Sequence, residues 1–293
     1  MVISLNDPKR IKKVVLTDCR NGLDEFMAVV RFHAQLEFSP VFCENVKKNR
    51  ALIDRFLKEN RAIYGVTTGF GENVRYVIPP EDAQQLQKNI VRSHACAVGE
   101  PLSEEKVRAV MLMTILNAGK AHSGIRLETL ELIRQFLNRN IVPYAPSEGS
   151  VGYLGVEAHL VMAYIGEGTV LRGGQRLPAL EVMREYGLEP LTLGCKEGLS
   201  MLNGTITVTA LGLIASYDSI LAMKNVEVAG ALCFEALRGA TKALDPRVHR
   251  NKDHCEQRQV AADMLRMLEG SEIIERHRDD KVQEDVYKRQ AER

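Results

Sequence analysis

The sequence predicts a mainly α-helical protein, organised as a long-helix bundle that is preceded by a mixed N-terminal region. From Pro79 onward, apolar residues recur at helical spacing in successive segments. Residues 196–237 form a very long helical segment with few charges, which is typical of a helix packed among other helices. Short β-like runs occur at Lys13–Thr17 and, as a small peripheral hairpin, at Gly168–Gly174.

The mixed region extends to about residue 60, and its pattern after the β-like run is helical through Leu57. The segment Ile63–Asn73 then contains three glycines and two threonines. Because periodic structure tolerates glycine at this density poorly, we expect an ordered loop there. A second loop rich in Pro, Gly and Ser, Pro143–Gly152, leads into a helix that continues through Met162.

Three helices are expected between these loops. The first covers Glu81–Arg92 and follows a Pro-Pro pair that suits a helix start. The second follows Ser103, which can cap it, and carries two glutamates in its first turn. The third has an apolar face from Leu127 to Leu137 and ends near Asn140. The apolar run Thr205–Met223 is interpreted as a buried bundle helix and not as a membrane span, because polar side chains interrupt it.

Composition excludes several classes of protein. The 293 residues are 45% hydrophobic and 26% charged, and 39 Lys+Arg nearly balance 38 Asp+Glu, so no electrostatic footprint for nucleic acid exists. Six scattered cysteines without a Cys-x-x-Cys pair fit reduced thiols. The charged N-terminus does not suit a signal peptide. We expect a cytoplasmic protein that binds neither nucleic acid nor membrane.

Generic motifs leave the chemistry open, since Gly69-Phe70-Gly71 lacks the remaining parts of a dinucleotide or phosphate loop. Several separate segments nevertheless follow one known order along residues 60–275. They are Tyr64-Gly-Val-Thr-Thr-Gly-Phe-Gly71, Ser93-His-Ala-Cys-Ala-Val-Gly-Glu-Pro101, Asn117 with Ser123-Gly-Ile-Arg126, Lys196-Glu-Gly-Leu199 with Asn203-Gly-Thr205, and Leu237-Arg-Gly239 with Asp245-Pro-Arg-Val-His249. In these segments the sequence resembles the N-terminal portion of the aromatic amino acid ammonia-lyases and aminomutases, with histidine ammonia-lyase closest.

The resemblance implies a helical bundle of the fumarase/aspartase-like type, a homotetramer whose sites combine residues of several subunits, and elimination of ammonia from an amino acid. It also implies an N-terminal active-site domain at residues 1–195 and the start of a central helical-bundle domain at 196–293. Family members continue well beyond this length, so we expect a truncated or interrupted chain. The family's electrophile is a methylidene-imidazolone ring, formed from an internal Ala-Ser-Gly, which serves as the electron sink for a poor leaving group.

The sequence departs from the family at that ring. The family's Gly-Ser-Val-Gly-Ala-Ser-Gly-Asp-Leu-Ala-Pro-Leu corresponds to Gly149–Leu160, where Tyr153 and Leu154 replace Ala and Ser and only Gly155 remains of the triad. Leucine has no hydroxyl to lose as water, so the methylidene cannot form by this route. We therefore expect no cofactor, and Tyr153 could fill the volume of the missing ring.

Four residues correspond to functional residues of the family. Tyr64 matches the general base, a phenol whose pKa of about 10 must be lowered by its environment, although it could also be a packed loop tyrosine. His94 and Gln283 match substrate-contacting residues, and Asn203 matches an amide near the ring and substrate. His94 and Asn203 could equally be satisfied buried polar residues. Lys196 and Glu197 are interpreted as structural, since they begin the helix leading to Asn203.

Three substitutions could create a new acid–base pair. Glu157 and His159 stand where the family has Leu and Pro, and His122 stands where it usually has an aromatic residue. Convergence with His94 could form a metal site, but solvated or packed side chains are the default and no metal is predicted.

Three functions remain open. The first is an ammonia-lyase-family enzyme, a carbon–nitrogen lyase acting on an amino acid such as histidine. The second is an electrophile-independent lyase or isomerase that uses Tyr64 on a substrate with a more acidic proton or a better leaving group. The third is a non-catalytic partner subunit that pairs with an intact lyase chain.

Overall fold

The computed structural model describes residues 7–18, 21–59, 61, 63–69, 75–76, 78–79, 82–149 and 154–278. The chain divides into two compact units, with the boundary between Ala215 and Ser216. The boundary expected from the sequence, at 195/196, falls earlier, before helix α8 (Glu197–Leu202). The difference arises because α8 packs against α3 (Ala83–His94) and α6 (Gly155–Tyr164), both inside the first unit.

The first unit begins with a parallel strand pair. Strand β1 (Lys13–Leu16) confirms the predicted β-like run and pairs with β2 (Gln35–Phe38), and α1 (Leu23–Val30) connects the two strands. Helix α2 (Pro40–Lys58) follows directly. The hydroxyl of Ser39 accepts the Phe42 N–H at 3.2 Å, so that this residue caps α2 ahead of a proline that favours the first helical position.

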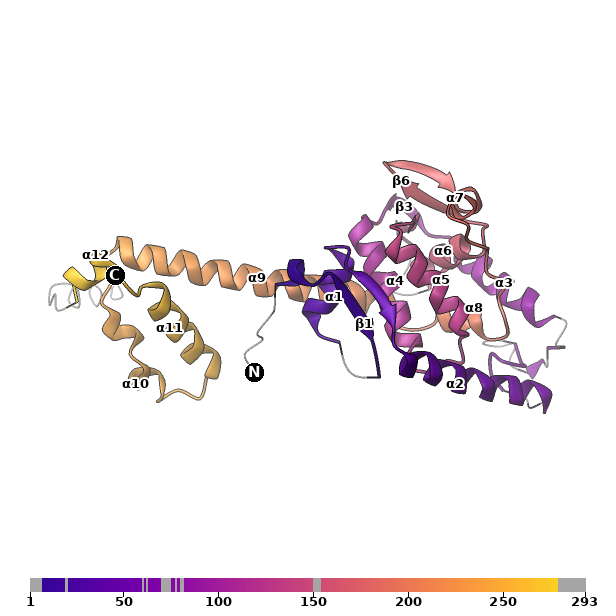
Figure 1. The fold of residues 1–293 in the computed structure, drawn as a ribbon, viewed down its shortest axis with the longest axis horizontal. Coiled ribbons are helices and arrows are strands. Elements are labelled where there is room, and N and C mark those ends of the chain that lie inside the picture. Colours follow the sequence, from indigo (N-terminus) through magenta and orange to yellow (C-terminus); the bar gives the residue numbers. More distant parts are fainter. Residues whose placement is uncertain are drawn as a thin grey trace. The chain divides into compact units, whose positions relative to one another are not determined.

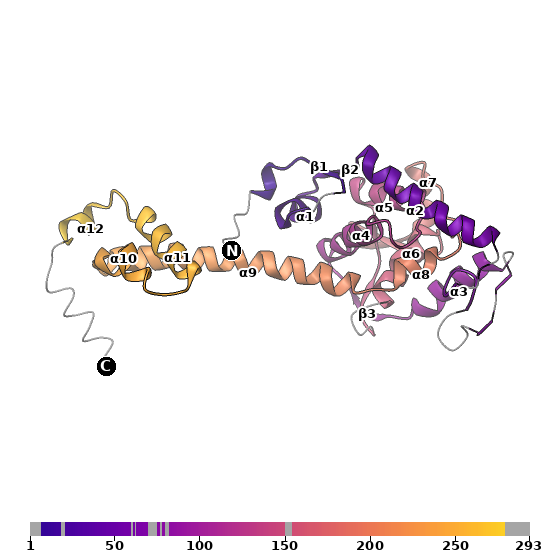
Figure 2. The same ribbon diagram turned by 90° about the horizontal axis from the view of Figure 1, so that it is seen from below.

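A cluster of helices forms the core of the first unit (Figures 1 and 2). Besides α3, α6 and α8 it contains α4 (Glu104–Ala118) and α5 (Leu127–Asn138). The helix predicted after Ser103 is confirmed as α4, while α3 begins at Ala83, after the expected Glu81. Most of the apolar positions that predicted α4 and α5 lie in the core, with the following residues fully buried: Val107, Val110, Met111, Ile115, Leu130 and Ile133.

Two small sheets complete the first unit. Strand β3 (Val98–Pro101) pairs antiparallel with β5 (Pro146–Glu148). The predicted hairpin is confirmed as β6 (Thr169–Arg172) and β7 (Gln175–Pro178), and β4 (Val142–Pro143) adds a third strand. Gly173 and Gly174 form the hairpin turn with φ of 56° and 79°, a conformation that glycine adopts without steric cost. Helix α7 (Ala179–Glu185) follows β7.

An arginine that the sequence analysis did not single out holds three helices together. Arg108 on α4 is 1% exposed. Its guanidinium donates to the carbonyl oxygens of Val30 (3.0 Å) and Val29 (2.6 Å) at the end of α1. It also donates to the Leu137 carbonyl (2.9 Å) and the Asn140 side chain (2.7 Å) at the end of α5. The planar group thus satisfies the Val29 and Val30 carbonyls at the end of α1 and adds a second donor to the Leu137 carbonyl, which also accepts the Asn140 N–H at 3.2 Å.

The long helical segment is interrupted. The sequence suggested one stretch from about residue 196, but α8 ends at Leu202 and α9 (Ile206–Ala236) starts after a turn. Gly204 in this turn has a φ of 145°, which L side chains rarely adopt, and it explains why the helix breaks there.

Helix α9 leads into the second unit. There it is followed by the 3₁₀ turn η3 (Thr241–Leu244), α10 (Pro246–His249), α11 (Cys255–Met267) and α12 (Glu272–Arg276). The Asp245 carboxylate accepts the Arg247 N–H at 2.8 Å and so caps α10. A small apolar core consists of Ala231, Leu244, Ala261, Leu268 and Ile274.

Burial of α9 is limited within this chain. Exposed large apolar side chains on it are Val208, Leu221, Met223, Val226, Val228 and Leu232. The helical stretch Glu197–Ala236 is long and apolar enough to cross a membrane by length and composition, with a mean hydropathy of 1.6 and 28% of its most apolar window buried. Core helices of soluble bundles pass the same test. The described part of this chain is mainly helical, as the sequence predicted, and these apolar side chains of α9 are exposed within it.

Candidate active site

The three helices α3, α6 and α8 pack against one another, and each carries a predicted site residue at one end. Side-chain and backbone contacts hold α3 and α8 close together. The Gln87 side-chain oxygen accepts the Leu199 N–H at 3.1 Å, and a Cβ on Gly198 would lie 2.8 Å from the Gln87 carbonyl oxygen. Only glycine permits this approach. Helix α3 ends at His94, and α8 ends just before Asn203.

The loop that carries Tyr64 is ordered over its described residues, 63–69, as predicted. The Thr67 hydroxyl accepts the Ile63 N–H at 2.9 Å and donates to the Arg61 carbonyl. The Cys195 thiol donates to the Val66 carbonyl, which ties the loop to the residues just before α8. Tyr64 is 51% exposed, which argues against a tyrosine packed under the fold.

His94 is half-buried at the end of α3. Its Nδ1 lies 2.8 Å from the Ile90 carbonyl oxygen and 3.0 Å from the Ser93 hydroxyl. Because a carbonyl oxygen only accepts, Nδ1 carries the hydrogen in this tautomer, and Nε2 is the nitrogen that can accept a hydrogen bond. Asn203 is exposed, directly after α8.

Leu154 occupies the position immediately before α6 with φ of 73° and ψ of −52°. These angles fall in the strained γ-turn region, which a leucine adopts only when its surroundings enforce it. The side chain is a hydrocarbon, so Leu154 and Gly155 do not provide the hydroxyl from which the family's ring forms. Tyr153 and Gln283 lie outside the described residues.

The structure gives Glu157 and His159 different surroundings. Glu157 is 1% exposed, and its Oε1 accepts both the backbone N–H (3.0 Å) and the hydroxyl (2.7 Å) of Thr207 on α9. His159 is half-buried; burial and the nearby Arg176 lower its pKa, while its hydrogen bond to the Ala97 backbone opposes the change. The two side chains thus do not form the predicted acid–base pair.

His122 is exposed in the connection between α4 and α5. In the part of the chain that the structure describes, no three His, Cys, Asp or Glu side chains are grouped as metal ligands. The hypothesis of a converged metal site at His94, His122, Glu157 and His159 is therefore not supported by these residues.

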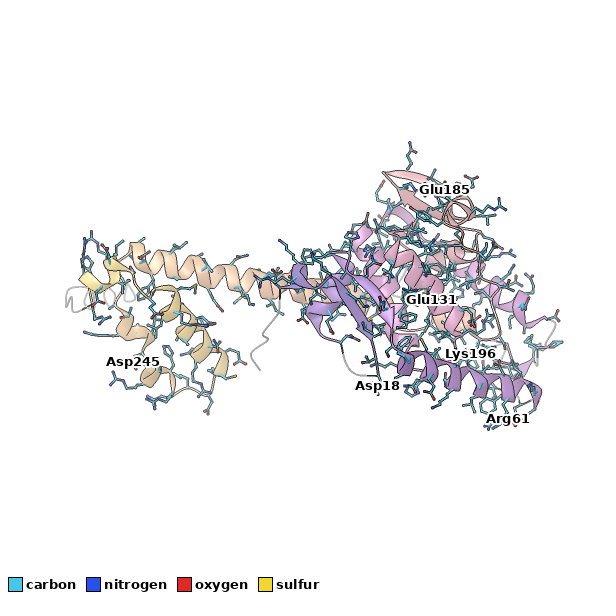
Figure 3. The ribbon with its side chains drawn as sticks, in the orientation of Figure 1. Asp18, Arg61, Glu131, Glu185, Lys196 and Asp245 are labelled. Carbon is cyan, nitrogen blue, oxygen red and sulfur yellow. The ribbon has the colours of Figure 1, made fainter. Side chains whose placement is uncertain are left out.

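Glu197 has the contacts of a structural residue, in agreement with the sequence analysis. It is fully buried and accepts hydrogen bonds from Arg126 Nε (2.9 Å), the Thr129 hydroxyl (2.6 Å) and the Gly194 N–H (2.7 Å). Burial alone would raise its pKa, but these donors outweigh it and lower the pKa. The neighbouring Lys196 is half-buried with a φ of 69°, and burial lowers the pKa of its ammonium (Figure 3).

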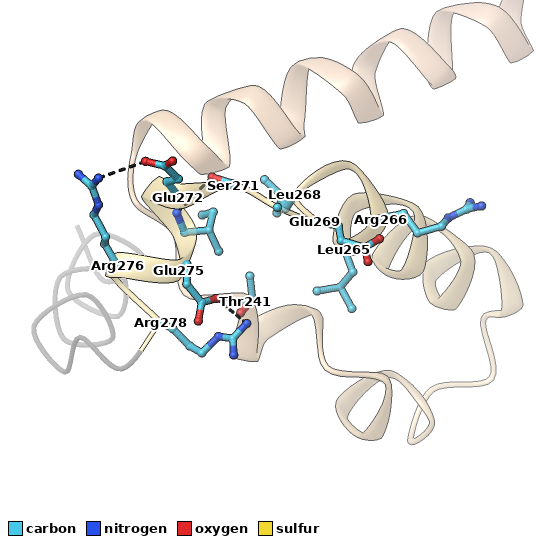
Figure 4. A pocket seen from close by; sticks show the side chains of 12 residues that line it. Thr241, Leu265, Arg266, Leu268, Glu269, Ser271, Glu272, Glu275, Arg276 and Arg278 are labelled. Carbon is cyan, nitrogen blue, oxygen red and sulfur yellow. Dashed lines mark hydrogen bonds and ion pairs between the residues drawn. The ribbon is translucent and has the colours of Figure 1, made fainter.

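A pocket of about 800 Å³ lies in the second unit and contains none of the predicted site residues (Figure 4). Four of its charged side chains pair with one another: Arg276 with Glu272 at 3.1 Å, and Arg278 with Glu275 at 2.7 Å. The candidate site is therefore the helix junction of the first unit.

The sequence did not reveal the residues whose hydrogen bonds join the helices of this site. Gln87 and Thr207 carry no motif of their own, and their roles depend on partners far along the chain. The sequence indicates Arg126 only as the last residue of the segment Ser123–Arg126, which matches the family. A buried polar residue in an otherwise apolar helix face was the one available signal for Gln87, which is 1% exposed.

Comparison with known proteins agrees with this fold. The family model "Aromatic amino acid lyase" matches residues 22–290. A histidine ammonia-lyase of Caldanaerobacter subterraneus subsp. tengcongensis is 39% identical over 280 residues, which cover 94% of this chain and 55% of the relative. The chain thus spans about half the length of the relatives it matches.

Solved structures show the same architecture. Tyrosine aminomutase of Streptomyces globisporus superposes with a TM-score of 0.85 at 32% identity, covering 89% of this chain and 50% of that one. The ergothioneine-degrading enzyme ergothionase of Treponema denticola gives a TM-score of 0.77 at 28% identity, covering 87% and 51%. With its helix junction, its anchored tyrosine loop and these matches, the chain belongs to the aromatic amino acid lyase family.

Proposed function

We propose that this chain forms the N-terminal, substrate-binding half of an amino acid lyase, of the histidine or aromatic amino acid class, that works without the methylidene-imidazolone ring. One observation carries the proposal: Leu154, with its hydrocarbon side chain, stands immediately before α6, where the ring's serine would be required. Elimination must then depend on the base and on the leaving group.

The residues of this chain can provide the base and bind the substrate. Tyr64 is 51% exposed on an anchored loop, and as a phenolate its oxygen takes the β-proton of the substrate and becomes the neutral phenol. The C–H electron pair forms the double bond, and the C–N pair leaves with the amine. His94 Nε2 accepts a hydrogen bond from the substrate, and the Asn203 amide orients it.

Without an electron sink, the amine must leave without electrophilic help. A quaternary ammonium group leaves more readily than a primary amine, because it departs as a neutral tertiary amine and does not have to be protonated first. Ergothioneine, an imidazole amino acid derivative with a quaternary amine, is named for one structural relative. We therefore propose histidine-like betaines as the favoured substrates, with histidine itself second.

We also propose a cytoplasmic homo-oligomer, most simply a tetramer. Tyr64 and Asn203 are exposed in the single chain, and α9 presents an apolar surface. Additional copies would cover that surface and close the site over the substrate.

The test measures amine release and ultraviolet absorbance of the product for ergothioneine, histidine, phenylalanine and tyrosine. Tyr64→Phe should abolish turnover of the active substrate. Tyr186→Phe is a matched control, because Tyr186 is also exposed, at 41%, and lies at the end of α7. Equal activity of Tyr64→Phe and wild type would refute the role of this base.

A chain that releases no amine from any of the four substrates would favour the alternative of a non-catalytic partner. The specific observation behind this alternative is the exposed apolar surface of α9. Co-expression with an intact histidine ammonia-lyase chain and co-purification of the two would support it.

A further inference from the structure

A buried carboxylate joins the starts of two helices in the first unit. Glu157 lies in the first turn of α6, and Thr207 lies in the first turn of α9. The two are 1% and 5% exposed, and Glu157 Oε1 accepts both hydrogen bonds that Thr207 offers. Helix α9 has no acidic residue in its own first turn, so Glu157 provides the anionic partner that a helix N-terminus favours.

Both helices follow turns of the candidate site. The Ala158 N–H donates to the Leu154 carbonyl at 2.9 Å, so the first turn of α6 closes on the strained residue. Helix α9 follows the turn that begins at Asn203 and contains Gly204. One carboxylate thus connects the Leu154 turn with the Asn203 turn, although the two are far apart in sequence.

Stability alone does not account for a glutamate here. Among the described residues, no group donates to Glu157 Oε2, although this oxygen is buried. A buried, unpartnered carboxylate oxygen is costly, and an apolar side chain of similar volume would avoid that cost. The benefit of the carboxylate is therefore geometric: it fixes one helix start against the other.

We infer that Glu157 is a positioning residue that holds the strained Leu154 turn in register with the Asn203 amide. It does not touch the substrate, because it is buried. The inference rests on the proposed function only in treating these two turns as parts of one site; the connection itself is a property of the fold.

Hydrogen exchange followed by mass spectrometry tests the connection without any substrate. In Glu157→Leu, peptides covering residues 154–160 and 203–210 should both exchange about tenfold faster, since the charged acceptor of two hydrogen bonds is lost. Peptides of α4 and α5 should not change. Glu157→Gln should stay within about twofold of wild type, because an amide oxygen can still accept both hydrogen bonds.

Faster exchange in residues 203–210 alone would show that Glu157 only caps α9, and this would overturn the inference. Unchanged exchange in both peptides would also overturn it. Glu128→Leu is the control, because Glu128 is an exposed acidic residue in the first turn of α5. If Glu157→Leu does not fold, Thr207→Val removes only the hydroxyl donor and should accelerate both peptides by a smaller factor. An inactive chain that shows the predicted exchange pattern would refute the proposed function but support this inference.

Discussion

Replacing Arg108 with methionine should lower the free energy of unfolding by about 3–5 kcal/mol. The guanidinium makes four hydrogen bonds at the ends of α1 and α5, at 2.6–3.0 Å, three of them to buried backbone carbonyls and one to the exposed Asn140 side chain. Each orphaned acceptor costs roughly 1–3 kcal/mol, but carbonyl oxygens accept from other donors after small shifts, so the sum is reduced. Methionine retains the apolar volume of the arginine stem, so the loss reports on the hydrogen bonds.

Urea unfolding, followed by circular dichroism, measures this loss as a lower midpoint at an unchanged slope. Arg108→Lys should recover only a small part, because one ammonium cannot span acceptors on two helix ends. Arg184→Met is the control, since Arg184 is exposed on α7, and should change stability by less than about 0.5 kcal/mol. A loss below about 1 kcal/mol for Arg108→Met would refute the assignment of Arg108 as the link between these helices.

Further predictions concern the helix junction and the exposed helix. Gly198→Ala should destabilise the chain by about 1–3 kcal/mol in the same urea assay, because the new Cβ would press on the Gln87 carbonyl; a neutral change would contradict the close approach. The pKa of Glu197 is lowered, so its contribution is present above the ordinary value of 4.5 and is lost as pH falls through the lowered value. In Glu197→Gln the free energy of unfolding should therefore fall less steeply below about pH 4.5 than in the wild type. An unaltered pH profile would argue against a stabilising role of the ionised Glu197. Leu232→Asp should reduce self-association in sedimentation velocity if other copies cover α9, and an unchanged distribution would count against that role.

Local patterns in the sequence predicted most of the first unit. The β-like run, the Gly-Gly hairpin and the helix after Ser103 depend on neighbouring residues, and each is present in the structure. The break at Gly204 was missed because apolar spacing continues on both sides of it, while the interruption depends on one backbone angle.

The site could be predicted only in part. Resemblance nominated Tyr64, His94 and Asn203, whereas the contacts that join the tyrosine loop and the helices, Cys195 with Val66 and Leu199 with Gln87, link residues far apart in the sequence. Glu157 was considered as an acid–base residue, whereas its oxygen is engaged by Thr207, fifty residues further along the chain. Side-chain partners at that separation depend on packing, which composition and periodicity do not determine.

The central claim, a lyase-family chain without the self-formed ring, is tested most directly by intact mass together with the near-ultraviolet difference spectrum before and after borohydride treatment. Ring formation would remove two waters from the chain and create an absorbance that borohydride quenches. We predict the unmodified mass calculated from the sequence and no quenchable absorbance. A mass lower by two waters, with a band that borohydride removes, would contradict the claim and restore the electrophile to the mechanism.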